Sequence, residues 1–237
     1  MTIDINSLKS DDVYNTAVWY ETLQEIRELP LIFDLSRIKS LPGIGTQWTY
    51  GYTVEFDKYS TDLTQKTVPF PILAGREKEL QELQRILLKT EGNNALIVGE
   101  PGVARHRLVE TFAHRILIGQ VPQSLSHKRV LLLNMHQLVS SEPSILEAKG
   151  LASKILDEAA ASGNIITVID NIDEFLSSGE GKIDLTDIFT KLAESSIGVI
   201  GITTPGAYHK YIETNSAISP LFETITIESP TMEVLLR

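Results

Sequence analysis

Between residues 67 and 237, short apolar runs alternate with segments that have the spacing of amphipathic helices. The apolar runs are typical of buried strands: ALIVG (95–99), RVLLLNM (129–135), NIITVID (164–170), GVIGITT (198–204) and ETITIES (223–229). Because helical segments separate these runs, the pattern predicts an α/β fold with a parallel sheet that is covered by helices on both faces.

The helical segments also predict which side chains are buried. Leu108, Phe112 and Ile116 recur every fourth residue and predict the buried face of one helix. Another segment ends at Gly163, the residue type that is favoured just after a helix. The predicted helices are ARHRLVETFAHRILIG (104–119), SILEAKGLASKILDEAAASG (144–163) and a segment around LTDIFTKLAESS (185–196).

Residues 1–66 have a different pattern. VYNTAVWYETLQEIREL (13–29) has a ragged helical face, and Trp48, Tyr50 and Tyr52 alternate with smaller residues as in a short strand with one aromatic face. Such a face suits peptide binding, and the simpler interpretation, which we favour, is an appendage that packs on the core of its neighbour. The sequence therefore predicts two domains, a small N-terminal appendage with helical and aromatic-rich segments at 1–66 and a core at 67–237.

Composition excludes several classes of function. The 237 residues are 42% hydrophobic and 22% charged, which is typical of a globular protein. The net charge of −10 argues against binding to nucleic acid or to an anionic membrane. The chain has no cysteine, so it has no thiol nucleophile and no thiolate metal site. No signal peptide is evident and no run approaches the ~18 apolar residues of a membrane span, so we expect a cytoplasmic protein.

The segment GEPGVARH (99–106) follows the first apolar run, where a phosphate-binding loop is expected. The motif of such loops is Gly, four residues, then Gly-Lys-Ser/Thr, and this chain has Ala104, Arg105 and His106 at the last three positions. The methyl group of Ala104 stands where the backbone approaches the phosphates. Arg105 differs in shape from lysine, and Mg²⁺ prefers oxygen ligands to the imidazole of His106.

The run that ends in TVID offers a second part of the same site. Asp170 is the acid expected to organise Mg²⁺, but the next residue is Asn171, whose amide cannot accept a proton from an attacking water. The loss of a general base costs about 10²–10⁴-fold in rate. We expect Asp173 and Glu174 to point elsewhere, as acids at a helix start. The sequence thus predicts no catalytic residue and no metal site; the remaining histidines share no ligand spacing.

Arg105, His106 and Arg107 remain at the start of the predicted helix, and helix N-termini bind anions readily. An anion site without a metal is therefore one hypothesis. The other is that Arg107, and Arg105 with it, lies in solvent or pairs with nearby acids.

Longer stretches carry a resemblance to a known family. PILAGREKELQELQRILLKTEGNNALIVGEPGV, GNIITVIDNIDEF and GVIGITTPGAYHKYIETNSAISPLF follow one another in the order seen in the Clp-type AAA+ protein unfoldases, and residues 57–237 resemble their first ATPase module. The resemblance implies the large subdomain of an AAA+ P-loop NTPase, with five parallel strands in the order 5-1-4-3-2. It also implies a hexameric ring, protein clients, and a helical lid that would begin where this chain stops, at Arg237.

The resemblance further implies a set of nucleotide-binding positions, which we interpret as vestigial: Leu73, Ala74, Gly99, Glu100, Pro101, Gly102, Val103, Ala104, Arg105, His106, Arg107, Asp170, Thr203 and Thr204. The aromatic pore loop of the family is replaced by Pro143, Ser144, Ile145 and Leu146. The family's trans-acting arginines are replaced by Pro220 and Leu221, before Phe222.

These replacements predict a degenerate Clp-like AAA+ module without ATP hydrolysis. It would be a structural or regulatory part of a protein-remodelling assembly, and it would associate with itself or with other AAA+ subunits. Two alternatives remain open: an ATPase module with weak or magnesium-independent binding of ATP or ADP, and a piece of a longer chain with a second, intact ATPase module. No cofactor is certain.

Overall fold

The computed structural model describes three stretches of the chain, residues 53–65, 75–176 and 183–228. The chain divides into two compact units, Met1–Pro42 and Gly43–Arg237, and all of the described residues lie in the second. The predicted helix at 13–29, the predicted aromatic strand at 48–52, and Leu73 and Ala74 lie outside the described residues.

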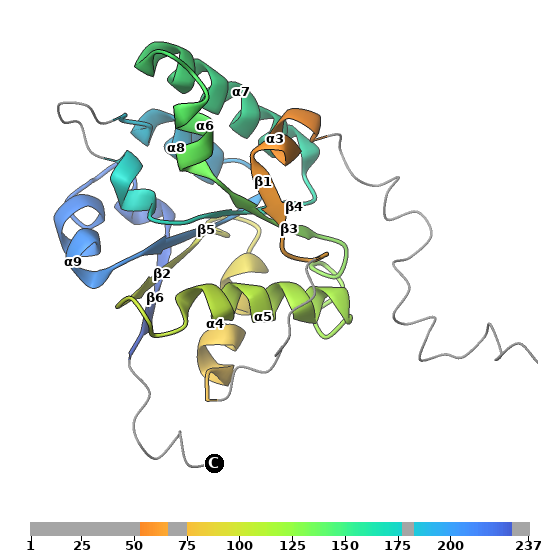
Figure 1. Cartoon of the computed structure of the whole chain (residues 1–237). Helices are drawn as coiled ribbons and strands as arrows, with labels where there is room; N and C mark the ends of the chain where they lie inside the picture. The colour runs from red at the N-terminus through yellow and green to blue at the C-terminus, as the bar shows by residue number, and fades with distance from the viewer. Residues whose placement is uncertain (1–52, 66–74, 177–182, 229–237) are drawn as a thin grey trace, which may run out of the picture. The chain divides into compact units, whose positions relative to one another are not determined.

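One sheet organises the described residues, with strand order β1-β3-β4-β5-β2-β6 (Figure 1). Five of its strands are mutually parallel, and their order is the predicted 5-1-4-3-2 read from the other edge. These strands are β2 (Ala95–Gly99), β3 (Arg129–Leu133), β4 (Ile165–Ile169), β5 (Gly198–Thr203) and β6 (Glu223–Ile227). They coincide with the five apolar runs, so the predicted α/β fold is confirmed.

The prediction of a five-stranded, wholly parallel sheet is wrong at one edge. A sixth strand, β1 (Ser60–Asp62), pairs antiparallel with β3. Its three residues are Ser, Thr and Asp, so no apolar run marks it in the sequence. The predicted strand 129–135 is also two residues too long. Strand β3 ends at Leu133, because Asn134 caps helix α6 (Met135–Ser140) and Met135 begins it.

Two hydrophobic clusters cover the two faces of the sheet. Along β2, Leu96 and Val98 point into one cluster, and Ala95 and Ile97 point into the other, as the two-residue period of a strand requires. The first cluster contains side chains of α3 (Val54–Lys58), α6, α7 (Ile145–Ser162) and α8 (Thr186–Ala193). The second contains side chains of α4 (Glu77–Leu87) and α5 (Arg105–Leu117), which lie on the opposite face in Figure 1.

The predicted helices are confirmed as α5, α7 and α8. Leu108, Phe112 and Ile116 are buried on the inner face of α5. At the start of α7, the hydroxyl of Ser144 accepts a hydrogen bond from the Glu147 backbone N–H at 3.2 Å. Gly163 ends this helix with φ of 72°, a left-handed conformation that glycine adopts without strain.

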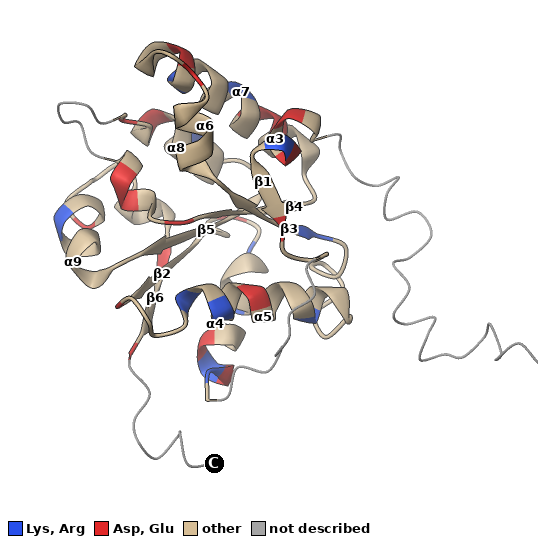
Figure 2. Ribbon diagram, in the orientation of Figure 1, with Lys and Arg blue, Asp and Glu red and all other residues tan. Residues whose placement is uncertain are grey.

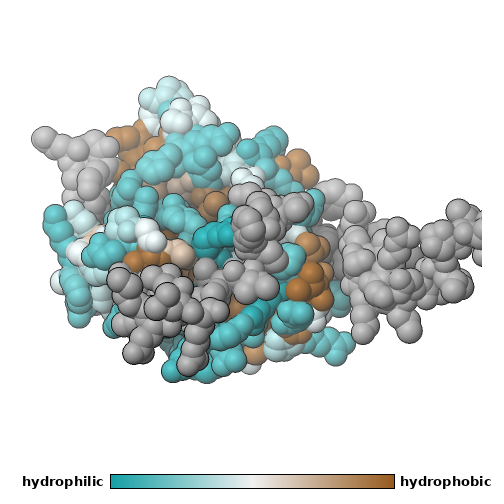
Figure 3. Space-filling view, turned by 60° about the horizontal axis from the view of Figure 1, so that its bottom comes forward, coloured by the Kyte–Doolittle hydropathy of each residue, from teal (hydrophilic) through white to brown (hydrophobic). Residues whose placement is uncertain are grey.

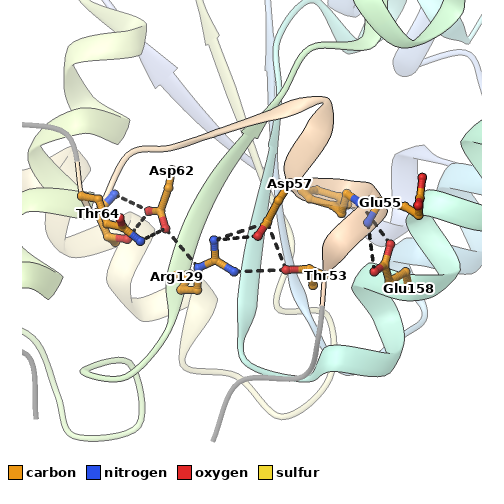
Figure 4. Close-up of polar contacts among 9 residues, drawn as sticks. Thr53, Glu55, Asp57, Asp62, Thr64, Arg129 and Glu158 are labelled. Carbon is orange, nitrogen blue, oxygen red and sulfur yellow. Dashed lines mark hydrogen bonds and ion pairs between the residues drawn. The ribbon is translucent and has the colours of Figure 1, made fainter. Parts of the chain in front are cut away.

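The segment 53–65 is held on the core by polar contacts as well as by burial (Figure 4). Phe56 of α3 is completely buried. The carboxylate of Glu158, on α7, accepts hydrogen bonds from the backbone N–H groups of Glu55 (3.3 Å) and Phe56 (3.0 Å). This part of the first predicted zone thus supplies one strand and one helix to the core, while the domain boundary at residue 66 stays a prediction.

Within the described stretches, no helix has the length and apolar character that crossing a bilayer requires. The face in view in Figure 3 is largely hydrophilic, with separate hydrophobic spots. The large hydrophobic side chains that are exposed are scattered over several elements: Val54, Leu88, Leu117, Ile118, Ile145 and Leu146. The cytoplasmic location stays a prediction.

Candidate functional site

Three of the predicted site segments meet at the carboxyl ends of neighbouring strands. The loop 100–104 follows β2, Asp170 follows β4, and Thr203 ends β5, which lies between β4 and β2. Ligands of open parallel sheets bind at this edge. Short elements continue from it: η3 (Ile172–Phe175), α9 (Pro205–Ala207), η4 (Tyr208–Ile212) and η5 (Ser219–Leu221).

The loop after β2 has the backbone of a tight, glycine-dependent turn. Gly102 has φ of 95°, and Ala104 has φ of 68° and ψ of 33°, so both are left-handed. A side chain at Gly99 would place its Cβ 2.8 Å from Cγ2 of Val103 and 3.0 Å from the carbonyl of Ile227, which explains the glycine there. Ala104 adopts a left-handed conformation that costs an L-residue about 1–2 kcal/mol. The remaining loop residues, Glu100 and Pro101, are exposed.

His106 and Asp170 bridge the start of α5 and the end of β4. Nε2 of His106 lies 2.8 Å from Oδ2 of Asp170, and both side chains are partly exposed. The hydrogen bond to Asp170 raises the pKa of His106 above its ordinary value. Burial opposes ionisation of Asp170, but the bond and charge of His106, with the Asn171 backbone N–H, hold its pKa below the ordinary value. The contact therefore favours the protonated form of the imidazole and the ionised form of the carboxylate.

A second bridge joins the end of β5 to η3. The hydroxyl of Thr203 donates to Oδ1 of Asp173 at 2.6 Å. Asp173 and Glu174 lie in the first turn of η3, as predicted. The expectation that Asp173 points elsewhere is wrong to this extent, because its carboxylate contacts a predicted site residue. Sequence reasoning missed the contact because its two partners, on η3 and β5, are 30 residues apart in the sequence. The next residue, Thr204, caps α9.

Asn171 follows Asp170 and has no carboxylate. Its φ of 47° is left-handed, and its backbone N–H donates to Oδ1 of Asp170 at 3.0 Å. The amide side chain thus stands at the turn after β4, where a general base would be needed.

Arg105 and Arg107 differ sharply at the start of α5, where Figure 2 shows the basic residues. Arg107 is partly exposed and lies 3.4 Å from Glu110, as the second hypothesis expected. Arg105 is only 8% exposed, so the expectation of a solvent position is wrong for it. Its Nη1 is buried and has no hydrogen-bond partner among the described residues. Its positive charge opposes the rise in the pKa of His106 and adds to the fall in the pKa of Asp170.

A parallel sheet of this order, with a tight loop and helix after β2 and an acid after β4, has the general arrangement in which α/β proteins bind phosphate-containing ligands. No protein-family model matches the chain. Individual relatives do match. The chaperone protein ClpB of Wolinella succinogenes is 35% identical over 185 residues, 76% of this chain. The ClpC/MecB protein of Bacillus subtilis, a negative regulator of genetic competence, is 33% identical over 186 residues, also 76% of this chain.

Solved structures agree with these relatives. A complex of Hsp104 from S. cerevisiae with casein superposes with a TM-score of 0.66 at 26% identity, over 76% of this chain and 31% of that one. The Hsp104–ADP complex gives a TM-score of 0.67 at 24% identity, over 75% of this chain and 26% of that one. The matched part of this chain is a Clp-type AAA+ module. The chain spans 22% of the ClpB relative and 23% of the ClpC/MecB relative.

Two further family positions are described. At the position predicted for the pore loop, Ile145 and Leu146 are exposed at the start of α7. At the position predicted for the trans-acting arginines, Pro220 and Leu221 belong to η5, and Phe222 is buried.

The residues present fit a phosphate group better than they fit Mg²⁺. Magnesium requires near-octahedral oxygen ligands, whereas His106 offers an imidazole and already engages Asp170. Within the described stretches, no three His, Asp or Glu side chains gather in a way that would hold a metal ion. The orphaned Nη1 of Arg105, in contrast, is suited to an anion.

Proposed function

We propose that this Clp-type module does not hydrolyse ATP and serves as a structural or regulatory part of a protein-remodelling assembly. The observation that carries this proposal is the 2.8 Å contact between His106 and Asp170. It uses the carboxylate that a catalytic metal would need, and it places an imidazole where the motif has a hydroxyl. Asn171 supplies no general base.

Relatives support the kind of assembly. ClpB is named a chaperone, and Hsp104 is solved in complex with casein. We therefore propose that this chain associates with itself or with other AAA+ subunits and that its assembly handles protein clients. The net charge of −10 favours neither nucleic acid nor an anionic membrane as a partner.

A second candidate function is an ATPase-type module that binds ATP or ADP weakly and is regulated by it. Arg105 favours this candidate, because its side chain is buried, its Nη1 has no hydrogen-bond partner among the described residues, and it keeps a cation at the phosphate-loop position. The two candidates agree that hydrolysis is absent or slow, and they differ in whether nucleotide binds.

Phosphate release from MgATP by the purified chain tests the proposal. The matched positive control carries Ala104→Gly, Arg105→Lys, His106→Thr and Asn171→Glu, which together restore the motif chemistry. We expect release by the natural chain to equal the protein-free blank, alone and mixed with an active Clp-type subunit. Release at about 1 s⁻¹ or faster, the low end of ordinary turnover numbers, would contradict the proposal.

A further inference from the structure

Most polar groups at the carboxyl edge of the sheet satisfy one another. His106 bonds Asp170, and Thr203 bonds Asp173. Arg105 is the exception. Four buried side-chain polar atoms in the described part of the chain have no hydrogen-bond partner, and Nη1 of Arg105 is the only one that carries charge.

A guanidinium nitrogen that is buried without a hydrogen-bond partner is energetically unfavourable, because burial removes its hydration and no hydrogen bond replaces it. A bound anion would restore both the charge balance and the missing hydrogen bond. Arg105 is also the first residue of α5, where the backbone N–H groups of the first turn have no partner within the helix. The helix end and the buried cation therefore favour the same kind of ligand.

The chemistry of the ligand follows from the shape of the loop. Left-handed residues at 102 and 104 keep the backbone turn of a phosphate-binding loop even though Ala104 replaces its glycine. A guanidinium pairs with two phosphate oxygens at once, which a lysine cannot do. The metal that normally accompanies the phosphates has no ligand set here, since His106 and Asp170 hold each other.

We propose that this site binds a phosphate group without a magnesium ion, with Arg105 as its main cation and the His106–Asp170 pair in place of the metal. The inference rests on the proposed function, in which the module does not hydrolyse ATP. It adds to that function a class of ligand, phosphate-containing molecules, and the property that they bind without magnesium. Both a nucleotide and a small free phosphate carry the required group.

Calorimetric titration of the full chain tests the inference, with ADP and inorganic pyrophosphate as probes, each in excess MgCl₂ and in EDTA. We expect binding whose affinity in EDTA is at least equal to that in magnesium. Arg105→Met should weaken it about tenfold or more, since one charge-assisted contact is lost. The matched control Arg115→Met removes an arginine near the other end of α5, where it bonds Glu77, and should change affinity less than about threefold. If ADP alone binds, the ligand is a nucleotide; if both probes bind, the phosphate group suffices.

Three results would overturn the inference: no heat with either probe up to millimolar concentration, binding that requires magnesium, or equal loss in the two arginine variants. Arg105→Lys keeps a cation at this position and should retain part of the binding. This second variant keeps the test valid if Arg105→Met fails to fold. Failure here is distinct from failure of the proposed function. The absence of binding leaves a non-hydrolysing structural module intact, whereas phosphate release from MgATP refutes the proposed function whatever the titration shows.

Discussion

Arg129 offers a sharp test of how the segment 53–65 is held. Its guanidinium contacts three partners in that segment: Nε donates to Asp62 at 3.0 Å, Nη1 to Thr53 at 3.1 Å, and Nη2 to Asp57 at 3.3 Å (Figure 4). The Arg129 side chain is only 17% exposed. The perturbation is Arg129→Met, which keeps the length of the side chain and removes its charge and donors.

The expected loss follows from burial. Removal of one partner of a buried ion pair costs about 3–5 kcal/mol. The cost is smaller here because Asp62 also accepts from the Thr64 backbone N–H, and Asp57 is well exposed, so about 2–3 kcal/mol is expected. Arg85→Met is the matched control. Arg85 also bonds carboxylates, those of Glu82 and Glu223, but it is 52% exposed, and such surface pairs are worth about 0–1 kcal/mol.

Circular dichroism during urea and thermal unfolding is the suitable assay, because both tryptophans, Trp19 and Trp48, lie outside the described residues. The expected fall in the thermal midpoint is about 4–12 °C for Arg129→Met, at roughly 2–4 °C per kcal/mol for a chain of this size. The control should move by about 3 °C or less. If Arg85→Met destabilised as much as Arg129→Met, the reasoning from burial would be refuted.

Three further outcomes are expected. Glu158→Ala removes the acceptor of two backbone N–H groups at the start of α3 and should lower the free energy of unfolding by about 1 kcal/mol in urea titrations; no change would deny that this contact caps α3. Ala104→Val should cost at least about 1 kcal/mol in the same assay, because a branched side chain is strained at φ of 68°, and a neutral result would argue against the left-handed loop. NMR titration should find the pKa of His106 above its ordinary value, and Asp170→Asn should lower that pKa. Because the pKa is raised in the folded state, the stabilisation from His106 is complete below the unfolded pKa and disappears as pH rises through the folded pKa. If the loss of thermal midpoint caused by His106→Gln grew with pH, this assignment would be contradicted.

The parallel part of the sheet was predictable because it is buried on both faces. Strands of this kind appear as continuous apolar runs, and β2, β4 and β5 are buried along their whole lengths. Strand β1 was not predictable in this way. Its Ser-Thr-Asp sequence pairs with β3 at the edge of the sheet, and Asp62 is held there by Arg129, which lies far away in the sequence.

The residue types of the candidate site were predictable, but their pairings were not. The motif positions of Ala104, Arg105 and His106 follow from their distance to Gly99. The contact of His106 with Asp170 depends on how α5 and β4 meet in space. The burial of Arg105 runs against the usual exposure of arginine, so sequence reasoning placed it in solvent or beside an acid as readily as at a ligand.

The most direct test of the central claim is electron paramagnetic resonance of Mn²⁺, a stand-in for Mg²⁺, with ADP and increasing amounts of the natural chain. The His106→Thr variant, which restores a hydroxyl ligand and frees Asp170, is the matched comparison. If the His106–Asp170 pair takes the place of the metal, no protein-bound Mn²⁺ signal will appear with the natural chain, and the spectrum will change only by the release of free Mn²⁺ as the chain takes up ADP. A spectral change that saturates with the natural chain and is lost in Asp170→Asn would contradict the claim, because it would mean that Asp170 binds a metal despite His106.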